Sequence, residues 1–428
     1  MKKILLTLIG LIVVTSISYA QRYDPSGRQM TPSQKMEKYF NPITTAVPFL
    51  MIAPDARSAG MGDIGSCSSA DANSQHHNPS KYVFNKSKFG ISFSYSPWLT
   101  SLSKSLGINL AYLSTFWKIT DMDAVAFSLR YFHLGTIDFT DEYGQVYANP
   151  SPNEFAIDVT YARKLTDVFS MALTPRFIFS NITSGYDMMN SSGKPGLAGA
   201  VDLSMCYEQD FKTKGMENST VRLGINISNM GNKMTYSSNA SPDARDFLPA
   251  NLKIGLSYTM DFDGYNCLAI LGEMNKLLVP TPPKTHLVYV VTGQDSNLVR
   301  EIYAGYNNKV SSAQGLFQSF YDAPNGFREE LYEIAWSFGL EYSYNNLLFV
   351  RTGGFFESKY KGNRKYLTFG AGLHYNIFQI DVSYLFSVSD QHHPLEHTLR
   401  FTLSFDLKSF KKDEIKKQDK PQGKSDRL

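Results

Sequence analysis

Long apolar runs are missing from most of this sequence. Beyond the first 20 residues no stretch of about 18 consecutive apolar residues occurs, so the sequence predicts no transmembrane helix. Charged residues are also few, at 19% against roughly 25% in soluble globular proteins. The net charge of +3 is too close to neutral to indicate a nucleic-acid partner. Aromatic residues are abundant instead, with 29 Phe and 26 Tyr.

Motifs of catalysis and of metal binding are absent as well. The chain has no G-x-S-x-G elbow, no H-E-x-x-H and no P-loop, which disfavours an enzyme. No C-x-x-C pair suggests zinc or a redox dithiol, and three cysteines leave at least one unpaired. His392, His393 and His397 surround Pro394, which keeps them off one helical face, so we interpret them as part of a solvated loop. We expect no cofactor and no metal; a weak surface metal site at these histidines is the alternative.

The N-terminus predicts export. Lys2 and Lys3 precede the short apolar run Ile4–Val14, and the small-residue site Ser18-Tyr19-Ala20 follows. This is the pattern of a secretory signal peptide, residues 1–20. The alternative is a membrane anchor, for which the apolar run is too short to span a bilayer comfortably.

Apolar and polar residues alternate from Phe89 onward. In the first such segment Phe89, Ile91, Phe93 and Tyr95 are separated by Gly and Ser. A membrane barrel turns its apolar face to lipid and its small or polar face to the lumen. We expect an all-β fold, a transmembrane antiparallel barrel of about fourteen strands at residues 88–406. These strands are predicted near residues 88–96, 107–118, 122–133, 154–163, 167–181, 196–208, 220–228, 250–259, 266–277, 331–344, 347–357, 365–375, 377–386 and 396–406.

The connectors between these segments alternate in length. Short links such as Tyr344–Leu347 alternate with long ones such as Leu134–Asn153, as the periplasmic turns and extracellular loops of an outer-membrane barrel do. One exception is Gln209–Ser219, which is long for a periplasmic turn. The link Leu278–Glu330 is too long for a passive loop, so we expect ordered surface structure there, with a helix-compatible stretch near Ser296–Tyr306.

Two segments do not alternate. Residues 21–87 are rich in small residues and precede the first strand, where a plug (hatch) would enter a barrel from the periplasm. Gly60-x-Gly62-x-x-Gly65 within it matches a nucleotide-binding fingerprint but lacks the strand and helix context, so close-packed backbone is the better interpretation. Residues 407–428 are rich in lysine and predict a disordered periplasmic tail.

The plug segment carries a family resemblance. Its A-G-M-G, A-D-A and Asn78-Pro79 motifs resemble the hatch of FadL-type barrels, although Ser80 replaces the alanine of their N-P-A motif. The longer run T-A-V-P-F-L-x-I-A-P-D-A-R-S-A-G-M-G-D, ending at Asp63, resembles the PorV (LptO) family of the type IX secretion system. The residues that carry the plug motif are Ala59, Gly60, Gly62, Asp63, Asp71, Asn78 and Pro79.

The resemblance implies a non-enzymatic protein of the cell outer membrane. Such a protein would bind the C-terminal signal domains of secreted cargo and shuttle them from a giant translocon barrel to the cell-surface sortase and attachment complex. Its contacts with cargo would lie on extracellular loops, and the link Leu278–Glu330 offers aromatic residues that suit a β-rich partner. These candidate cargo-binding residues are Tyr303, Tyr306, Phe317, Phe320 and Tyr321; packing of the same residues on the barrel rim is the alternative. A FadL-type channel for hydrophobic small molecules is the alternative function.

Overall fold

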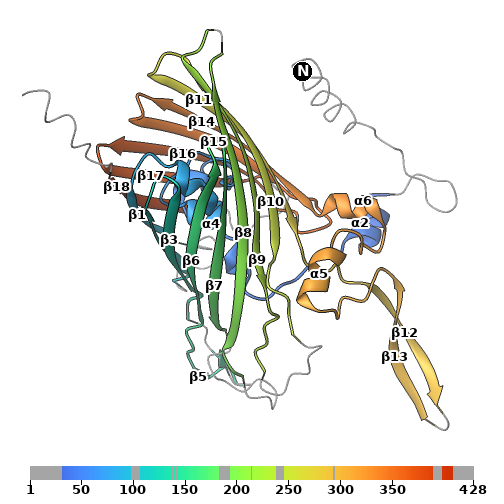
Figure 1. Ribbon diagram of the computed structural model, residues 1–428. Coiled ribbons are helices and arrows are strands. Elements are labelled where there is room, and N and C mark those ends of the chain that lie inside the picture. Colours follow the sequence, from blue (N-terminus) through green and yellow to red (C-terminus); the bar gives the residue numbers. More distant parts are fainter. Residues whose placement is uncertain are drawn as a thin grey trace, which may run out of the picture. The chain divides into compact units, whose positions relative to one another are not determined.

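The barrel predicted from the alternating pattern is present in the computed structural model (Figure 1), in which fourteen antiparallel strands close into one sheet. The structure describes residues 31–97, 107–136, 139–140, 143–182, 193–213, 215–237, 245–292, 295–388 and 398–407. Each strand pairs with the next barrel strand along the chain, and the last closes on the first. The barrel strands are β1 Phe89–Pro97, β2 Asn109–Lys118, β3 Asp123–His133, β6 Asn153–Thr166, β7 Phe169–Asn181, β8 Gly196–Phe211, β9 Asn218–Gly231, β10 Asn251–Asp261, β11 Asn266–Leu277, β14 Ile334–Tyr344, β15 Leu348–Phe356, β16 Lys365–Tyr375, β17 Phe378–Ser387 and β18 Leu399–Leu407.

All fourteen predicted strands are confirmed. The alternation of apolar and polar residues located them because successive residues of a strand point to opposite faces of the sheet. Paired residues of neighbouring strands point to the same face, so Phe93 lies beside Leu403 on the outside while Ser94 lies beside Thr402 on the inside. The outward residues are large and apolar and the inward ones small, polar or charged, as a lipid-facing barrel requires. No helix among the described residues is long and apolar enough to cross a membrane.

The connectors divide the barrel into two ends. We name the end with the links 119–122, 167–168, 212–217, 262–265, 345–347 and 376–377 the turn end, and the opposite end the loop end. The expected alternation of short and long links therefore holds throughout. The exception expected at Gln209–Ser219 shrinks because β8 continues to Phe211 and β9 begins at Asn218.

The longest connector carries ordered structure, as expected, but not the predicted helix. Residues 296–306 fall largely in β13 (Asp295–Ala304), which pairs with β12 (Lys284–Thr292) in a separate hairpin. The β-branched Val299 and Ile302 favour a strand once β12 offers a partner, so pairing overrides the local helix tendency. Two short helices follow, α5 (Ser312–Gln318) and α6 (Phe327–Tyr332). A second small hairpin, β4 (Phe139–Thr140) and β5 (Val146–Ala148), lies in the link before β6.

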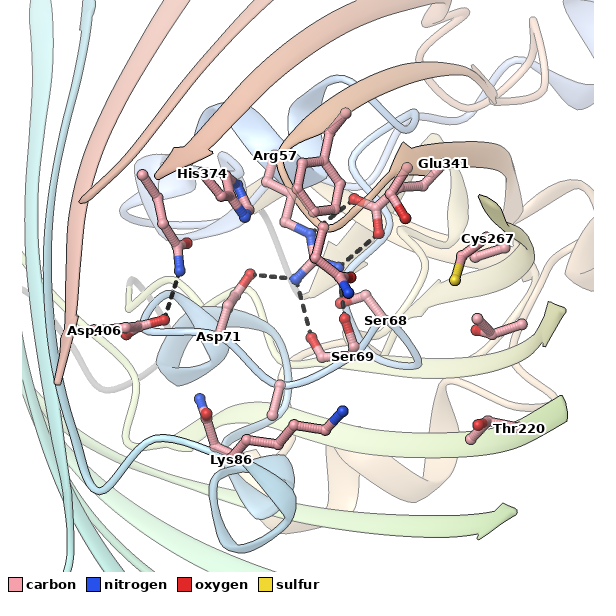
Figure 2. Close-up of a pocket in the computed structure, with 18 of the residues that line it drawn as sticks. Arg57, Ser68, Ser69, Asp71, Lys86, Thr220, Cys267, Glu341, His374 and Asp406 are labelled. Atoms are coloured by element: carbon pink, nitrogen blue, oxygen red, sulfur yellow. Dashed lines mark hydrogen bonds and ion pairs between the residues drawn. The ribbon is translucent and has the colours of Figure 1, made fainter. Parts of the chain in front are cut away.

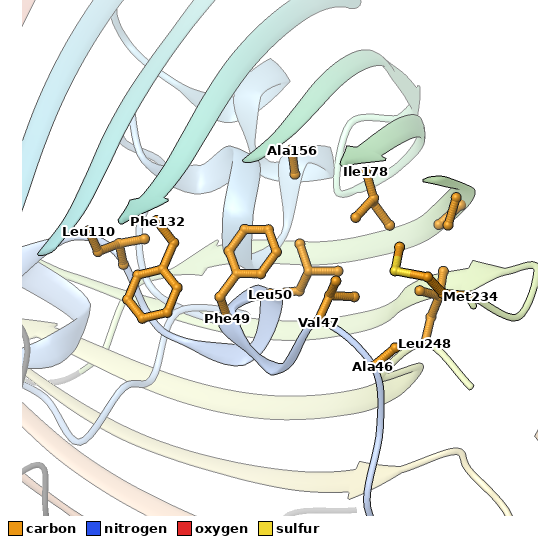
Figure 3. Close-up of a cluster of buried hydrophobic side chains, with 12 residues drawn as sticks. Ala46, Val47, Phe49, Leu50, Leu110, Phe132, Ala156, Ile178, Met234 and Leu248 are labelled. Carbon is orange, nitrogen blue, oxygen red and sulfur yellow. The ribbon is translucent and has the colours of Figure 1, made fainter. Parts of the chain in front are cut away.

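Residues 42–87, here called the inner segment, contact the inward face of the barrel. Their elements are η1 (Pro48–Met51), α3 (Ala56–Ala59), α4 (Ser74–His77) and η2 (Pro79–Phe84). Figure 3 shows Phe49 and Leu50 of η1 pointing toward inward side chains of the strands, and Phe49 stacks on Phe132 with ring centroids 6.1 Å apart. Burial of such side chains contributes roughly 1.5–3 kcal/mol each, so this apolar cluster holds the inner segment against the strands.

Residues 1–41 form a separate unit. Its described part is α2 (Pro32–Tyr39), which begins with proline and is closed by a capping box between Thr31 and Gln34. The expected signal peptide, the histidines at 392–397 and the expected tail beyond Leu407 lie outside the described residues.

Candidate functional site

The predicted Asn78-Pro79 motif joins the inner segment to the barrel wall. Pro79 is the first residue of η2, where a missing N–H removes no helical hydrogen bond. The side chain of Asn78 caps this helix by accepting from the backbone N–H of Ser80 at 3.2 Å. Its amide donates to the backbone carbonyls of Ser66 and Met205, at 3.0 and 2.9 Å. Because Met205 belongs to β8, these hydrogen bonds hold the motif against the barrel wall.

The predicted glycine motif lies where backbone meets backbone. A Cβ on Gly60 would lie 3.0 Å from the Cα of Gly370 on β16. Gly62 has a φ of +72°, and a Cβ there would lie 2.7 Å from the carbonyl oxygen of Gly354 on β15. Close-packed backbone therefore explains both glycines. Ala59, which completes the motif, is fully buried at the end of α3.

Asp63 is held by two strands. Its carboxylate accepts a hydrogen bond from the hydroxyl of Tyr366 on β16 and another from Nη1 of Arg400 on β18, the latter at 2.8 Å. Residue 63 itself has a φ of 62°, a conformation that aspartate tolerates better than most residues. The motif that carries the family resemblance thus builds contacts with β15, β16 and β18.

A series of linked, buried ion pairs connects the inner segment to the barrel wall. Arg57 donates to Asp71 at 2.9 Å within the segment and to Glu341 on β14 at 2.8 Å. Glu341 accepts in turn from Nε of Arg351 at 2.6 Å, and Arg351 donates to Asp381 at 2.6 Å. Two guanidinium groups share one carboxylate here, so loss of Glu341 would leave Arg57 with Asp71 and Arg351 with Asp381 as their remaining carboxylate partners.

Histidines of the inner segment are structural. His77 Nε2 lies 2.7 Å from Oδ1 of Asp55. Nδ1 of His76 lies within hydrogen-bond reach of Arg130, and because a guanidinium only donates, this ring nitrogen accepts. Within the part of the chain that the structure describes, no group of three His, Cys, Asp or Glu side chains could hold a metal ion.

A polar cavity of about 750 Å³ opens at the turn end (Figure 2). Its lining includes the charged side chains of Arg57, Asp71, Lys86 and Glu341, and Figure 2 shows Arg57 between Asp71 and Glu341. So polar a lining has little to offer a hydrophobic ligand.

A second cavity, of about 550 Å³, lies at the loop end and is different in character. It is lined by Pro48–Ala53 of the inner segment and by residues of β3, β10, β11, β14, β15, β16 and β18. Phe49, Ile52, Phe132, Leu277 and Phe355 give it apolar walls.

The predicted cargo-binding aromatics lie on the long connector at the loop end, and all five are exposed. Phe317 of α5 is 74% exposed. Tyr303, Tyr306, Phe320 and Tyr321 are about half exposed, so packing against the rim accounts for part of their surface at most. Sequence reasoning missed Phe327 at the start of α6, which is 76% exposed and lies on the same connector.

A buried ionic network anchors this connector to the rim. Lys276 at the end of β11 donates to Glu330 at 2.9 Å and to Glu333 at 2.7 Å. Lys361, in the link before β16, donates to Glu329 at 2.7 Å and to Glu333 at 3.0 Å. Lys276 pairs across the sheet with outward residues yet is buried, so the α6 region covers the outer side of the rim.

Carboxylates of the long connector differ in their pKa values. Burial, with Glu330 and Glu333 nearby, raises the pKa of Asp322 to about 6. Burial alone would raise the pKa of Glu333 too, but Lys276 and Lys361 outweigh it and hold that pKa below its usual range. Sequence reasoning missed the network, although a lysine after Ile270, Gly272 and Met274 on the lipid-facing side of β11 was a usable signal.

Comparison with known families finds one that covers more than half of this chain. Residues 34–284 match the family model described as "Type IX secretion system protein PorV". That description names a secretion component and no catalytic activity, in agreement with the expectation that the chain is not an enzyme. No curated protein sequence is similar enough to this chain to count as a match.

Several solved barrels resemble the chain at low identity. The Ralstonia pickettii toluene transporter TbuX is 10% identical, with 82% of this chain and 98% of that one covered and a TM-score of 0.44. The Pseudomonas putida toluene transporter TodX is 12% identical, with 82% and 95% covered and a TM-score of 0.43. A Pseudomonas aeruginosa FadL homologue is 12% identical, with 86% and 99% covered and a TM-score of 0.41. Identities this low transfer no ligand and no function.

Proposed function

This chain belongs to the PorV family of type IX secretion system proteins, and from that membership we propose that it binds the C-terminal signal domains of secreted cargo. The barrel and the family imply an outer-membrane location. In the proposal, residues 1–20 direct export and the protein shuttles cargo from the translocon to the cell-surface sortase and attachment complex. The loop end faces the outside, where released cargo arrives.

The observation that carries the proposal is an exposed aromatic surface on an anchored support. Interfaces enrich Tyr, Phe and Trp because these side chains bury a large area at a small cost in side-chain entropy. Here Phe317 and Phe327 are about three-quarters exposed. The network of Lys276, Lys361 and Glu333 fixes the connector that bears them, so binding need not order a mobile loop first.

The inner segment supports a platform rather than a pore. In the proposal it is a plug, because its backbone and side chains bond to inward residues on several strands of the wall. Ser66 N donates to Glu273 on β11 at 2.9 Å, and Ala56 N donates to Thr402 on β18 at 2.8 Å. A lumen filled in this way leaves the loops as the working surface.

The test is a capture experiment with variants of the aromatic surface. A double variant Phe317→Ser and Phe327→Ser, expressed in the producing cell, should recover at least about tenfold less cargo and sortase complex in a tagged pull-down. The control is Tyr375→Ser, an equally exposed aromatic (70%) at the turn end. Equal recovery by the double variant and the control, with both barrels folded, would contradict the proposal.

A second candidate, a FadL-type channel for hydrophobic small molecules, is favoured by the apolar cavity at the loop end. Passage would require the inner segment to leave its contacts with the wall. A deletion strain separates the two functions. Normal surface display of cargo together with loss of uptake of hydrophobic compounds would support the channel, and the reverse result would support the shuttle.

A further inference from the structure

The basic tail that follows β18 begins beside the polar cavity at the turn end, here called the turn-end cavity. β18 ends at the turn end, because its Phe405 pairs with Phe378, the first residue of β17 after the link 376–377. Asp406 of β18 lines the cavity. Leu407 is followed by 21 residues, of which four are acidic and eight are cationic, namely Lys408, Lys411, Lys412, Lys416, Lys417, Lys420, Lys424 and Arg427. A segment with a net charge of +4 therefore starts at the edge of the cavity.

Carboxylates outnumber cations in the lining of the turn-end cavity (Figure 2). Five carboxylates stand against three cations, and they are Asp71, Glu208, Asp261, Glu341 and Asp406 against Arg57, Lys86 and Arg222. Both arginines already donate to lining carboxylates, Arg222 to Glu208 at 2.6 Å. Asp261, by contrast, accepts from a neutral group, the backbone N–H of Gly264, at 2.7 Å. The excess of negative charge favours a cationic occupant.

A buried amide in the same lining suits a peptide. Asn85, which follows η2, lines the cavity and is only 7% exposed. Its Oδ1 accepts from the backbone N–H of Ser87 at 2.9 Å, but its Nδ2 has no acceptor among the residues that the structure describes. A buried donor without an acceptor is costly, and the backbone carbonyl of a bound peptide would accept from it. The lining thus offers carboxylates to ammonium groups and an N–H donor to a peptide backbone.

We propose that the tail of the same chain folds back into the turn-end cavity and binds there, with its first lysines against the carboxylates of the lining. Residues 408–417 alone reach roughly 33 Å when fully extended, so the length of the chain permits this. A cavity of about 750 Å³ has the size of a small-ligand pocket and takes a few residues of the tail, which we assign to Lys411–Lys417. This inference does not depend on cargo binding, since the long connector at the loop end plays no part in it.

The test uses the native thiol of Cys267, which lines the cavity. Cys67 and Cys206 are fully buried, so a thiol reagent reaches Cys267 first. In the full-length protein, an uncharged maleimide carried on polyethylene glycol should label Cys267 slowly, because the tail covers it. A quadruple variant keeps the length of the tail, removes four of its charges and should be labelled at least about tenfold faster; its changes are Lys411→Gln, Lys412→Gln, Lys416→Gln and Lys417→Gln.

The matched control removes acidic groups from the same part of the tail. Asp413→Asn, Glu414→Gln and Asp419→Asn together leave the lysines in place and should be labelled no faster than the unchanged protein. A synthetic peptide of residues 408–420, added to the quadruple variant, should restore slow labelling, and salt at about 0.5 M should cancel that effect. Equal labelling rates in the unchanged protein and the quadruple variant would overturn the proposal. Protection that fades on dilution would overturn it too, because the tail of a second copy would then be the occupant.

Discussion

Arg57 of the inner segment forms a bidentate pair with Glu341 of β14, with Nε to Oε2 at 3.0 Å and Nη2 to Oε1 at 2.8 Å. Such fork-to-fork pairs fix geometry as well as charge. Glu341 also accepts from Arg351, so one carboxylate joins segment and wall. Together with the pair between Asp63 and Arg400, it lets charge as well as apolar packing hold the inner segment against the wall.

Glu341→Gln should loosen the inner segment. The variant removes the carboxylate that Arg57 and Arg351 share, while Asp71 and Asp381 still pair with them, so we expect a loss on the order of 1.5–3 kcal/mol. We expect faster hydrogen exchange over residues 55–71 and a larger ion conductance in planar bilayers. Asp123→Asn is the control, because its pair with Arg163 at 3.4 Å is exposed on the arginine side and contributes about 1 kcal/mol or less. Equal conductance in the two variants would show that the pair does not close the lumen.

Gly224→Ala should disturb the same segment by volume alone. A Cβ on Gly224 of β9 would overlap the backbone carbonyl of Ser66, which cannot move without the chain around it. Gly199→Ala on β8 is the matched change, since the nearest atom to its Cβ would be 3.9 Å away. Heat-modifiability on gels should show a lower unfolding temperature for Gly224→Ala and an unchanged unfolding temperature for Gly199→Ala. A shift of equal size in both would mean that strand glycines matter for the strands and not for the segment.

Glu333→Gln should release the long connector. Glu333 accepts from Lys276 at 2.7 Å, from Lys361 at 3.0 Å and from Thr281 at 2.6 Å, and a neutral amide cannot satisfy both ammonium groups. Limited proteolysis on intact cells should cut the connector 278–333 several-fold faster, with the barrel intact. The control Glu357→Gln lies at the same end but pairs with the partly exposed Arg364. If protection is unchanged in Glu333→Gln, the network does not anchor the connector.

How far the sequence predicted this structure depends on the range of the interactions. Alternation such as Phe89, Ile91 and Phe93 is a local pattern, and it located every barrel strand because lipid on one side and lumen on the other impose a period of two. The helix predicted near Ser296–Tyr306 was wrong. The secondary structure of this segment depends on pairing with β12, which only the fold brings alongside.

The candidate site residues divide in the same way, into those explained by local sequence and those whose partners are distant in the sequence. The glycines of the inner segment were interpreted correctly as tight backbone, since Gly60 and Gly62 follow from local chemistry. The partners Arg57 and Glu341 stand 284 residues apart, and no local rule joins them.

Acidity should tighten the connector through Asp322. Burial and the neighbouring Glu330 and Glu333 raise its pKa to about 6, above the value of roughly 3.9 in an unfolded chain. The folded connector then holds a proton that the unfolded one releases, so its stability is highest below pH 4 and falls as pH rises through 6. In the unchanged protein Asp322 accepts from the backbone N–H of Thr281 at 3.1 Å. Asp322→Asn keeps an oxygen acceptor there and removes the titrating carboxyl group.

Hydrogen exchange over residues 318–333, corrected for intrinsic rates, should therefore quicken between pH 4 and 6.5 in the unchanged protein and stay flat over the same interval in Asp322→Asn. At pH 7 the asparagine variant should exchange more slowly, because no buried charge remains to repel Glu330 and Glu333. Glu357→Gln again serves as the control, with the slope of the unchanged protein. A slope that persists in Asp322→Asn would assign the pH dependence to Glu330, whose pKa is also raised by burial.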